Sequence, residues 1–351
     1  MTKRILIAPL NWGLGHATRC IPIIKALLQN NYTPTIASDG DALLLLAKEF
    51  PDLEALELPS YNIRYPKKGA LLKLKLLNDA PHILKAIGEE QKAVRTLIKT
   101  QRIDGIISDS RFGAYHETLP SVFITHQLKV LSGNTTWFST KIHENTIRRF
   151  DECWIPDSFG QPNLSGEMGH IDNSRLNLKY IGPLSRFHKI LMDPIYDVMI
   201  LLSGPEPQRE ILEKKLLEQF KSFKGKVLFV RGVMEKEQTV HTSKNLTIYN
   251  FMATNLLEKS LNESRLIVAR SGYTTLMDLA KLGKKAFFIP TPGQFEQEYL
   301  ARKMEADQAA PFCRQDDFTL EQLKRIEEFK GLETFHYNHD FKSLFHLFEG
   351  K

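Results

Sequence analysis

Two glycines and a histidine follow the first apolar run of the chain. Ile5–Leu10 leads into Gly13-Leu14-Gly15-His16. Glycines permit a tight turn, and the helix behind such a turn offers free backbone amides to a phosphate or a closely approaching substrate. A neutral imidazole placed there can take a proton from a hydroxyl near pH 7. We predict that His16 is a catalytic base and that Gly13 and Gly15 contact an acceptor; the alternative is a histidine that only caps the helix.

Two polar residues follow later apolar runs in the same half of the chain. Asp109 comes after Ile103–Ser108, and His126 comes after Val122–Thr125. In parallel sheets such positions gather at one edge, so both side chains are expected near His16. We predict that Asp109 is catalytic and that His126 binds the acceptor. The alternatives are an Asx turn at Asp109 and a loop histidine with ordinary partners at His126.

Neither a dinucleotide nor a metal ion is expected in this half. The Gly-x-Gly-x-x-Gly fingerprint is incomplete because Thr18 stands where its third glycine belongs, which disfavours NAD and FAD. Asp39-Gly40-Asp41 matches the Asp-x-Asp pattern with which some enzymes hold a cation against a diphosphate. Asp-Gly is also a common turn and Asp41 a good N-cap, so we predict no metal and no cofactor.

The second half contains its own candidate anion sites. Ser203-Gly204 follows the apolar run Val198–Leu202, and a second turn follows Leu266–Ala269. Both turns precede segments of helical period, where amides and hydroxyls are available to phosphate. The second turn and the helix behind it supply Arg270, Ser271, Gly272 and Thr275.

Two further groups in this half suit a sugar nucleotide. Asp278 lies two helical turns beyond Ser271, where a carboxylate can accept both hydroxyls of a ribose; its alternative is a solvated helix acid. The stretch from Pro290 to Glu298 contains Glu296 and Gln297, and amide and carboxylate groups together suit sugar hydroxyls.

The elements that position these residues have the rhythm of parallel βα units. Short apolar runs alternate with segments of helical period, and the alternation restarts after Asp197. We predict an α/β protein with two Rossmann-like domains whose parallel sheets face each other across a cleft. The expected domains are 1–183, which binds the acceptor, 184–335, which binds the donor, and a C-terminal helix over 336–351 that packs back on them.

The composition is that of a globular protein with a mild basic excess. The chain has 351 residues, 25% of them charged, a net charge of +6 and three separated cysteines. The net charge favours an anionic partner. The cysteines are too far apart in the sequence to form a Cys-x-x-Cys metal or redox site or a disulfide between neighbours. No apolar run approaches the roughly 20 residues of a membrane span. We predict a cytoplasmic protein with no nucleic-acid partner, since no helix-turn-helix, zinc or aromatic RNP pattern is present.

One basic, leucine-rich stretch suggests a membrane surface. The segment 64–77 contains Arg64, Lys67, Lys68, Lys73 and Lys75 among leucines, without an acid. Such a surface can rest on anionic lipid at the inner face of the cytoplasmic membrane and reach a lipid-linked acceptor. The alternative is a solvated helix whose leucines pack inward.

These segments resemble the GT-B glycosyltransferases, specifically the group that includes the peptidoglycan lipid-intermediate N-acetylglucosaminyltransferase and the plant galactolipid synthases. Gly13-Leu14-Gly15-His16 is similar to their N-terminal glycine loop. The run from Arg270 through Asp278 to Gln297 resembles their nucleotide-sugar signature.

The resemblance implies a role for each donor residue. The Ser271-Gly272 turn would lie on the diphosphate, Asp278, in place of the usual Glu, would hold the ribose, and Gln297 would touch the donor sugar. Phe251 and Met252 match a pair whose backbone contacts uracil, and Arg186 matches an interdomain basic residue near the phosphates.

The implied reaction is an inverting, metal-independent transfer of a hexose or N-acetylhexosamine from a UDP-sugar to an acceptor hydroxyl, with a lipid-linked or cell-envelope glycan as one class of acceptor. Two alternatives stay open. Gly15 to Cys20 also resembles the nucleotide-sugar hydrolases of the pseudaminic acid pathway, in which water replaces the acceptor. A non-enzymatic nucleic-acid-binding protein would use only the basic excess.

Overall fold

The computed structural model describes residues 2–61, 72–131, 136–171, 175–204, 206–233, 235–332, 337 and 339–350, with the backbone alone over 72–80. The chain divides into two compact units, and the division falls between Arg186 and Phe187. The C-terminal segment from Tyr337 belongs to the first unit.

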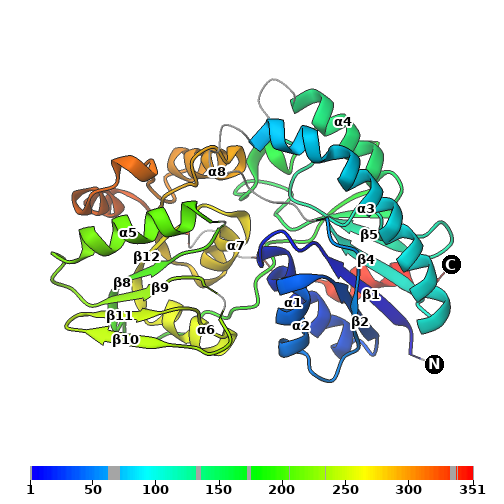
Figure 1. Ribbon diagram of the computed structural model, residues 1–351, viewed down its shortest axis with the longest axis horizontal. Helices are drawn as coiled ribbons and strands as arrows, with labels where there is room; N and C mark the ends of the chain where they lie inside the picture. The colour runs from blue at the N-terminus through cyan, green and yellow to red at the C-terminus, as the bar shows by residue number, and fades with distance from the viewer. Residues whose placement is uncertain are drawn as a thin grey trace. The chain divides into compact units, whose positions relative to one another are not determined.

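The first unit is built on a seven-stranded parallel sheet (Figure 1). Its strands are β1 Arg4–Pro9, β2 Thr33–Ser38, β3 Ala55–Glu57, β4 Gly105–Asp109, β5 Ser121–Ile124, β6 Glu152–Ile155 and β7 Leu178–Tyr180. Its helices are α1 Gly15–Gln29, α2 Gly40–Glu49, α3 Leu72–Gln101, α4 Thr136–Ile147 and α9 Phe341–Phe345, with short 3-10 helices at Gly166–Met168 and His346–Phe348.

The strand order of this sheet is β3-β2-β1-β4-β5-β6-β7. The order reverses next to β1, which pairs with β2 on one side and with β4 on the other. In open α/β sheets the carboxyl ends of strands at such a reversal leave room for a ligand. The point between β1 and β4 is therefore where this unit should hold a substrate.

The core of the first unit explains why its central strands are continuous apolar runs. β1 is buried from Ile5 to Pro9, because helices cover both of its faces. On one face Leu6 and Ala8 share a cluster with Val94 of α3. Figure 1 shows α3 on the side of this sheet away from α1 and α2.

The second unit contains a six-stranded sheet of the same kind. Its strands are β8 Tyr196–Leu201, β9 Val227–Val230, β10 Val240–Ser243, β11 Leu246–Tyr249, β12 Ser264–Ala269 and β13 Lys285–Phe288. Its helices are α5 Gln208–Phe220, α6 Thr254–Asn262, α7 Tyr273–Leu282 and α8 Phe295–Ala306, followed by 3-10 helices at Gln315–Asp317 and Leu320–Glu328.

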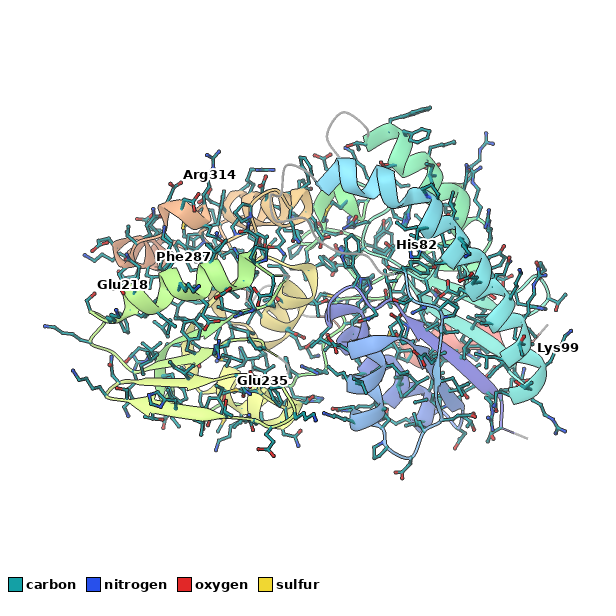
Figure 2. The ribbon with its side chains drawn as sticks, in the orientation of Figure 1. His82, Lys99, Glu218, Glu235, Phe287 and Arg314 are labelled. Atoms are coloured by element: carbon teal, nitrogen blue, oxygen red, sulfur yellow. The ribbon has the colours of Figure 1, made fainter. Side chains whose placement is uncertain are left out.

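The strand order here is β10-β11-β9-β8-β12-β13, and all pairs except β10 with β11 are parallel. The order reverses between β8 and β12. Phe287, labelled in Figure 2, lies in the core cluster with Leu212 and Leu216 of α5. The two sheets, one parallel and one parallel except for its β10–β11 pair, confirm the predicted α/β class.

Local sequence signals account for several element ends. α7 stops at Gly283, whose φ of +63° is left-handed. The amides of Gly283 and Lys284 bond to the carbonyls of Ala280 and Leu279, the pattern with which glycine commonly closes a helix. The next strand therefore starts at once, at Lys285, and its carboxyl end is delivered beside that of β12.

The C-terminal segment belongs to the core of the first unit. Phe345 and Phe348 are buried, and the ring of Tyr32 meets both edge-on. The three cysteines are buried and free, as expected for structural thiols. No helix in the described part of the chain is both long and apolar enough to span a bilayer.

Candidate active site

The reversal point of the first sheet brings His16 and Asp109 together. Asp109 is the last residue of β4 and pairs in register with Pro9, the last residue of β1. The chain leaving β1 turns through Gly13, whose φ is +78°, and enters α1 at Gly15. His16 lies in the first turn of α1, so both side chains stand at the carboxyl edge of the sheet. The sequence predicts that His16 and Asp109 lie near each other at this edge, and the structure agrees.

His16 and Asp109 form a hydrogen-bonded pair with a third member that we did not single out from the sequence. His16 Nδ1 lies 2.9 Å from Asp109 Oδ1. Arg19 donates from Nε to Asp109 Oδ2 and from Nη2 to Oδ1, so its guanidinium holds both carboxylate oxygens. Arg19 Nη2 also lies 2.8 Å from His16 Nδ1. A signal existed: residues three apart share a helix face, so Arg19 had to accompany His16.

The charges of this cluster are set by burial and by the Arg19 guanidinium. Burial alone would raise the pKa of Asp109, but Arg19 and then His16 outweigh it, and the pKa lies well below its usual range. The pKa of His16 is lowered, first by burial and then by Arg19, against the opposing effect of Asp109. At neutral pH the cluster therefore holds a carboxylate, a guanidinium and a neutral imidazole.

Two more side chains surround this cluster. His126 is buried, and its Nδ1 lies 3.4 Å from Arg19 Nη1, so the structure brings His126 to the predicted place. The Cys20 thiol lies 3.8 Å from Asp109 Oδ2. Burial, and then Asp109, raise the pKa of Cys20 well above its usual value, which keeps this thiol neutral.

The turn after β4 places Asp109 and Arg111 in two separate buried networks. Ser110 between them has a φ of +62°, uncommon for a residue with a side chain. Arg111 is fully buried, donates to Glu90 and lies 2.7 Å from Asp39 Oδ1. Glu90 also accepts from Gly113 N at 2.8 Å. This second network fixes the loop that aims Asp109 at His16.

The Asp39-Gly40-Asp41 segment has a different local role from the predicted one. The N-cap position of α2 is occupied by Asp39, and Asp41 lies inside the first turn, so the assignment of Asp41 as N-cap is wrong. The Asp39 side chain makes no capping bond; Asn11 Nδ2 donates to it at 3.1 Å and Arg111 at 2.7 Å. Within the described ranges no group of three or more His, Cys, Asp and Glu is arranged for a metal ion.

In the second unit the reversal point lies between β8 and β12. Ser203 and Gly204 follow β8 and are exposed. Ser271 and Gly272 follow β12, and Gly272 is the N-cap of α7 with no side-chain capping bond. A Cβ added at Gly272 would meet nothing within 4 Å, so the amides at the start of α7 border open space. The structure thus brings the two predicted turns to neighbouring strand ends.

A hydrogen-bonded set joins the turn after β12 to the loop after β13. Ser271 Oγ donates to the Gln297 carbonyl at 2.7 Å, and the Thr291 amide donates to Gln297 Oε1 at 2.8 Å. The Gln297 side chain is thereby fixed at this sheet edge. Thr291, which the sequence did not single out, is 3% exposed, and its Oγ1 has no partner among the residues that the structure describes. That oxygen lies 3.9 Å from where a Cβ at Gly204 would stand.

Arg270 takes a supporting position. It is 1% exposed, and its guanidinium donates to the carbonyls of Ile289, Pro290 and Gln208 and to Gln315 Oε1. Burial lowers its pKa to about 9. These contacts tie together the loops that follow β12 and β13, and direct contact of Arg270 with a donor stays a prediction.

The other predicted donor residues lie along the same unit, with one exception. Thr275 and Asp278 lie on α7 and Glu296 on α8, all three half-buried. Phe251 and Met252 follow β11, two strands from β8, and the Phe251 carbonyl accepts from Gln238 Nε2 at 2.9 Å. Arg186 ends the first unit, so its approach to the donor stays a prediction.

Comparison with known proteins identifies a family domain in the second unit and more distant relatives along most of the chain. Residues 207–328 match the glycosyltransferase family 28 C-terminal domain. The UDP-N-acetylglucosamine--N-acetylmuramyl-(pentapeptide) pyrophosphoryl-undecaprenol N-acetylglucosamine transferase of Haemophilus ducreyi is 24% identical over 93% of this chain and 89% of its own length. An uncharacterised glycosyltransferase of Methanosarcina acetivorans is 24% identical over 87% of this chain and 84% of its own.

Solved structures agree on the fold. MurG of Acinetobacter baumannii superposes with a TM-score of 0.59 at 14% identity, covering 99% of both chains. The glycotransferase of kitacinnamycin gives a TM-score of 0.62 at 14% identity, over 99% of this chain and 95% of its own. The chain is therefore a glycosyltransferase with the GT-B fold, and its second unit carries the family 28 C-terminal domain.

Proposed function

We propose that this glycosyltransferase moves a hexose or N-acetylhexosamine from a UDP-sugar to an acceptor hydroxyl, with inversion and without a metal ion. The observation that carries the proposal is the pair of His16 and Asp109, 2.9 Å apart at the reversal point of the first sheet. A neutral imidazole whose Nδ1 faces a buried carboxylate has the arrangement of a general base.

In the proposed step His16 takes the proton of the acceptor and UDP is the leaving group. The acceptor hydroxyl loses its proton to His16 Nε2 while its oxygen forms a bond to the anomeric carbon of the donor. The bond between that carbon and the β-phosphate oxygen breaks, and UDP leaves with the electron pair. His16 becomes an imidazolium beside the Asp109 carboxylate, which is ionised because its pKa lies far below neutrality. Gly13, Gly15 and His126 would contact the acceptor.

The donor would lie along the carboxyl edge of the second sheet. Anions are stabilised at a helix N-terminus, so the diphosphate belongs at the uncapped start of α7 beside Ser203 and Gly204. Gln297 would face the sugar and Asp278 the ribose. The remaining donor contacts that we propose are Arg186, Phe251, Met252, Arg270, Ser271, Gly272, Thr275 and Glu296.

The proposed donor nucleotide is supported by the Haemophilus ducreyi relative, whose name contains a UDP-N-acetylglucosamine donor and an undecaprenol-linked acceptor. A lipid-linked acceptor lies at a membrane surface, and we propose that the protein works at the cytoplasmic face of that membrane. Trp137 of α4 is 78% exposed and the neighbouring Phe138 is 59% exposed. Exposed aromatic rings suit a lipid interface. The basic stretch of 64–77 lies in a part of the chain whose side chains the structure does not describe.

The test is transfer and hydrolysis measured side by side. Purified protein is incubated with radiolabelled UDP-GlcNAc, UDP-glucose or UDP-galactose, with and without a lipid-linked glycan acceptor. We expect acceptor-dependent product, and we expect His16→Gln and Asp109→Asn to reduce its rate by about 100-fold or more. His82→Gln is the matched control, because His82, labelled in Figure 2, is exposed on α3.

Two results would change the assignment. Release of UDP at the full rate without an acceptor would replace the transferase with a nucleotide-sugar hydrolase of the pseudaminic acid pathway type. Full transfer by a His16→Gln, Asp109→Asn double variant would remove both residues from the reaction.

A further inference from the structure

Arg19 connects three side chains that belong to three different elements. It lies on α1, one turn after His16, and its side chain is 2% exposed. Its guanidinium holds both oxygens of Asp109 at the end of β4 and approaches His126 Nδ1, after β5, at 3.4 Å. A charge this deeply buried is retained in proteins only where it is paired.

Arg19 and Asp109 favour opposite protonation states of the same nitrogen, His16 Nδ1. His16 Nδ1 lies 2.9 Å from Asp109 Oδ1 and 2.8 Å from Arg19 Nη2. A carboxylate only accepts hydrogen bonds and a guanidinium only donates them. Asp109 therefore favours the tautomer with a proton on Nδ1, which leaves Nε2 bare, whereas Arg19 favours a bare Nδ1. The preferred tautomer depends on how firmly Arg19 holds the carboxylate.

The same contacts control whether His16 is charged. An imidazolium would be attracted by Asp109 and repelled by Arg19, both within direct contact distance of the ring. The other titratable groups of this cluster are Cys20, whose thiol contacts Asp109, and His126. The Cys20 thiol is neutral because burial raises its pKa. Arg19 is thus the cation that opposes protonation of His16.

We propose that Arg19 is a positioning residue for His16: it locks the Asp109 carboxylate and keeps the imidazole neutral, ready to take the proton of the acceptor. This inference rests on the proposed role of His16 as the general base. The buried ion pair of Arg19 and Asp109 then has a role in catalysis in addition to any role in stability. Without the guanidinium, Asp109 alone would face the ring and would draw a proton onto it before an acceptor arrives.

The experiment compares Arg19→Met, Arg19→Gln and Arg19→Lys with the wild type over pH 5–9. In Met and Gln variants the cation is absent, so the acid limb of the rate profile should move up by about one pH unit or more. The rate should recover at higher pH, where His16 is again neutral. Arg19→Lys keeps the charge but loses the planar fork, so its limb should stay near that of the wild type while kcat falls. Loss of activity by an equal factor at every pH would mean a purely structural role and would overturn the proposal.

A second measurement separates this inference from the proposed function. The ring protons of the histidines are titrated by NMR, and the His16 signal is assigned by its absence in His16→Gln. The midpoint for His16 should rise in Arg19→Met and Arg19→Gln and should fall in Asp109→Asn. This titration needs no turnover. An unchanged midpoint in all three refutes the role of Arg19, whereas the expected shifts without any sugar transfer refute only the proposed reaction.

Discussion

Replacing Thr291 by valine should change the stability of the free protein and its affinity for the donor in opposite directions. Thr291 Oγ1 is buried and has no partner among the described residues. A buried hydroxyl without a hydrogen bond costs about 1–3 kcal/mol, and valine has nearly the same shape without the hydroxyl. Thr291→Val should therefore stabilise the unliganded protein by about 1 kcal/mol, a rise in Tm of about 2–4 °C for a unit of this size.

The affinity should fall because the hydroxyl faces the place that we propose for the diphosphate. Thr291 Oγ1 lies 3.9 Å from where a Cβ of Gly204 would stand, in the turn after β8. A hydrogen bond to a charged group contributes about 1.5–3 kcal/mol, so its loss should weaken UDP binding by about tenfold or more. Calorimetric titration with UDP, UMP and the UDP-sugar measures this, and equal losses for UDP and UDP-sugar but not UMP would place the hydroxyl on the β-phosphate.

The chain offers a matched control in Thr35 of β2. Thr35 is 1% exposed, and its hydroxyl also has no partner within the residues described. It belongs to the first unit, whereas the proposed donor edge belongs to the second. Thr35→Val should raise the Tm similarly and leave UDP binding unchanged. If Thr291→Val instead lowers the Tm of the free protein, or raises it without weakening UDP binding, the assignment of this hydroxyl to the donor is wrong.

Three further changes test other parts of the structure. Burial lowers the pKa of His143 to about 4, so below pH 6.5 the unfolded chain binds a proton that the folded chain excludes. The free energy of unfolding should therefore fall by about 2 kcal/mol at pH 5. Urea unfolding at pH 5 and 7.5 should show this loss in the wild type and not in His143→Phe. Glu90→Ala takes the acceptor from Arg111, Tyr61 and Gly113 and should destabilise the first unit by about 3–5 kcal/mol in denaturant unfolding; an unchanged midpoint would mean that the network adds nothing. Trp137→Ser should weaken sedimentation with anionic vesicles, whereas Phe159→Ser, which removes an equally exposed ring, should not; equal losses would contradict a specific lipid face on α4.

The central strands were predictable because they are buried on both faces. Runs such as Thr33–Ser38 and Val227–Val230 contain mostly apolar and β-branched residues, and they are strands over those bounds. α3 and α4 were not predicted. α3 contains Pro81, a residue that disfavours the interior of a helix, so its sequence does not suggest a helix of 30 residues. Its helical state is supported by tertiary packing, as at Val94.

The contacts of a site follow from strand order only where the sheet reverses. His16 and Asp109 are 93 positions apart, yet both could be assigned to one edge, because Asp109 directly follows an apolar run and His16 follows another after a short glycine turn. Arg270 and Thr291 show the limit of that argument. Both follow strands of the second sheet, but the arginine turns inward to carbonyl oxygens. The threonine lies within the Pro290–Glu298 stretch without being singled out there, and it keeps a buried hydroxyl without a partner among the described residues. The position of a residue after a strand determines at which edge of the sheet it lies, whereas the packing of the following loop determines which of its atoms faces the ligand site.

Arg19 shows why charge cannot be assigned from a motif alone. The string from Gly15 to Cys20 places a cation one turn after the histidine, but the sequence does not tell whether that cation faces solvent, a substrate or an acid. The answer depends on Asp109, which β4 delivers from 90 positions away. Once the guanidinium holds that carboxylate, the histidine lies between opposite charges at nearly equal distances from its Nδ1 atom. Burial and the guanidinium oppose protonation of His16 whereas the carboxylate favours it, so removing the charge of Arg19 should raise the pKa of His16.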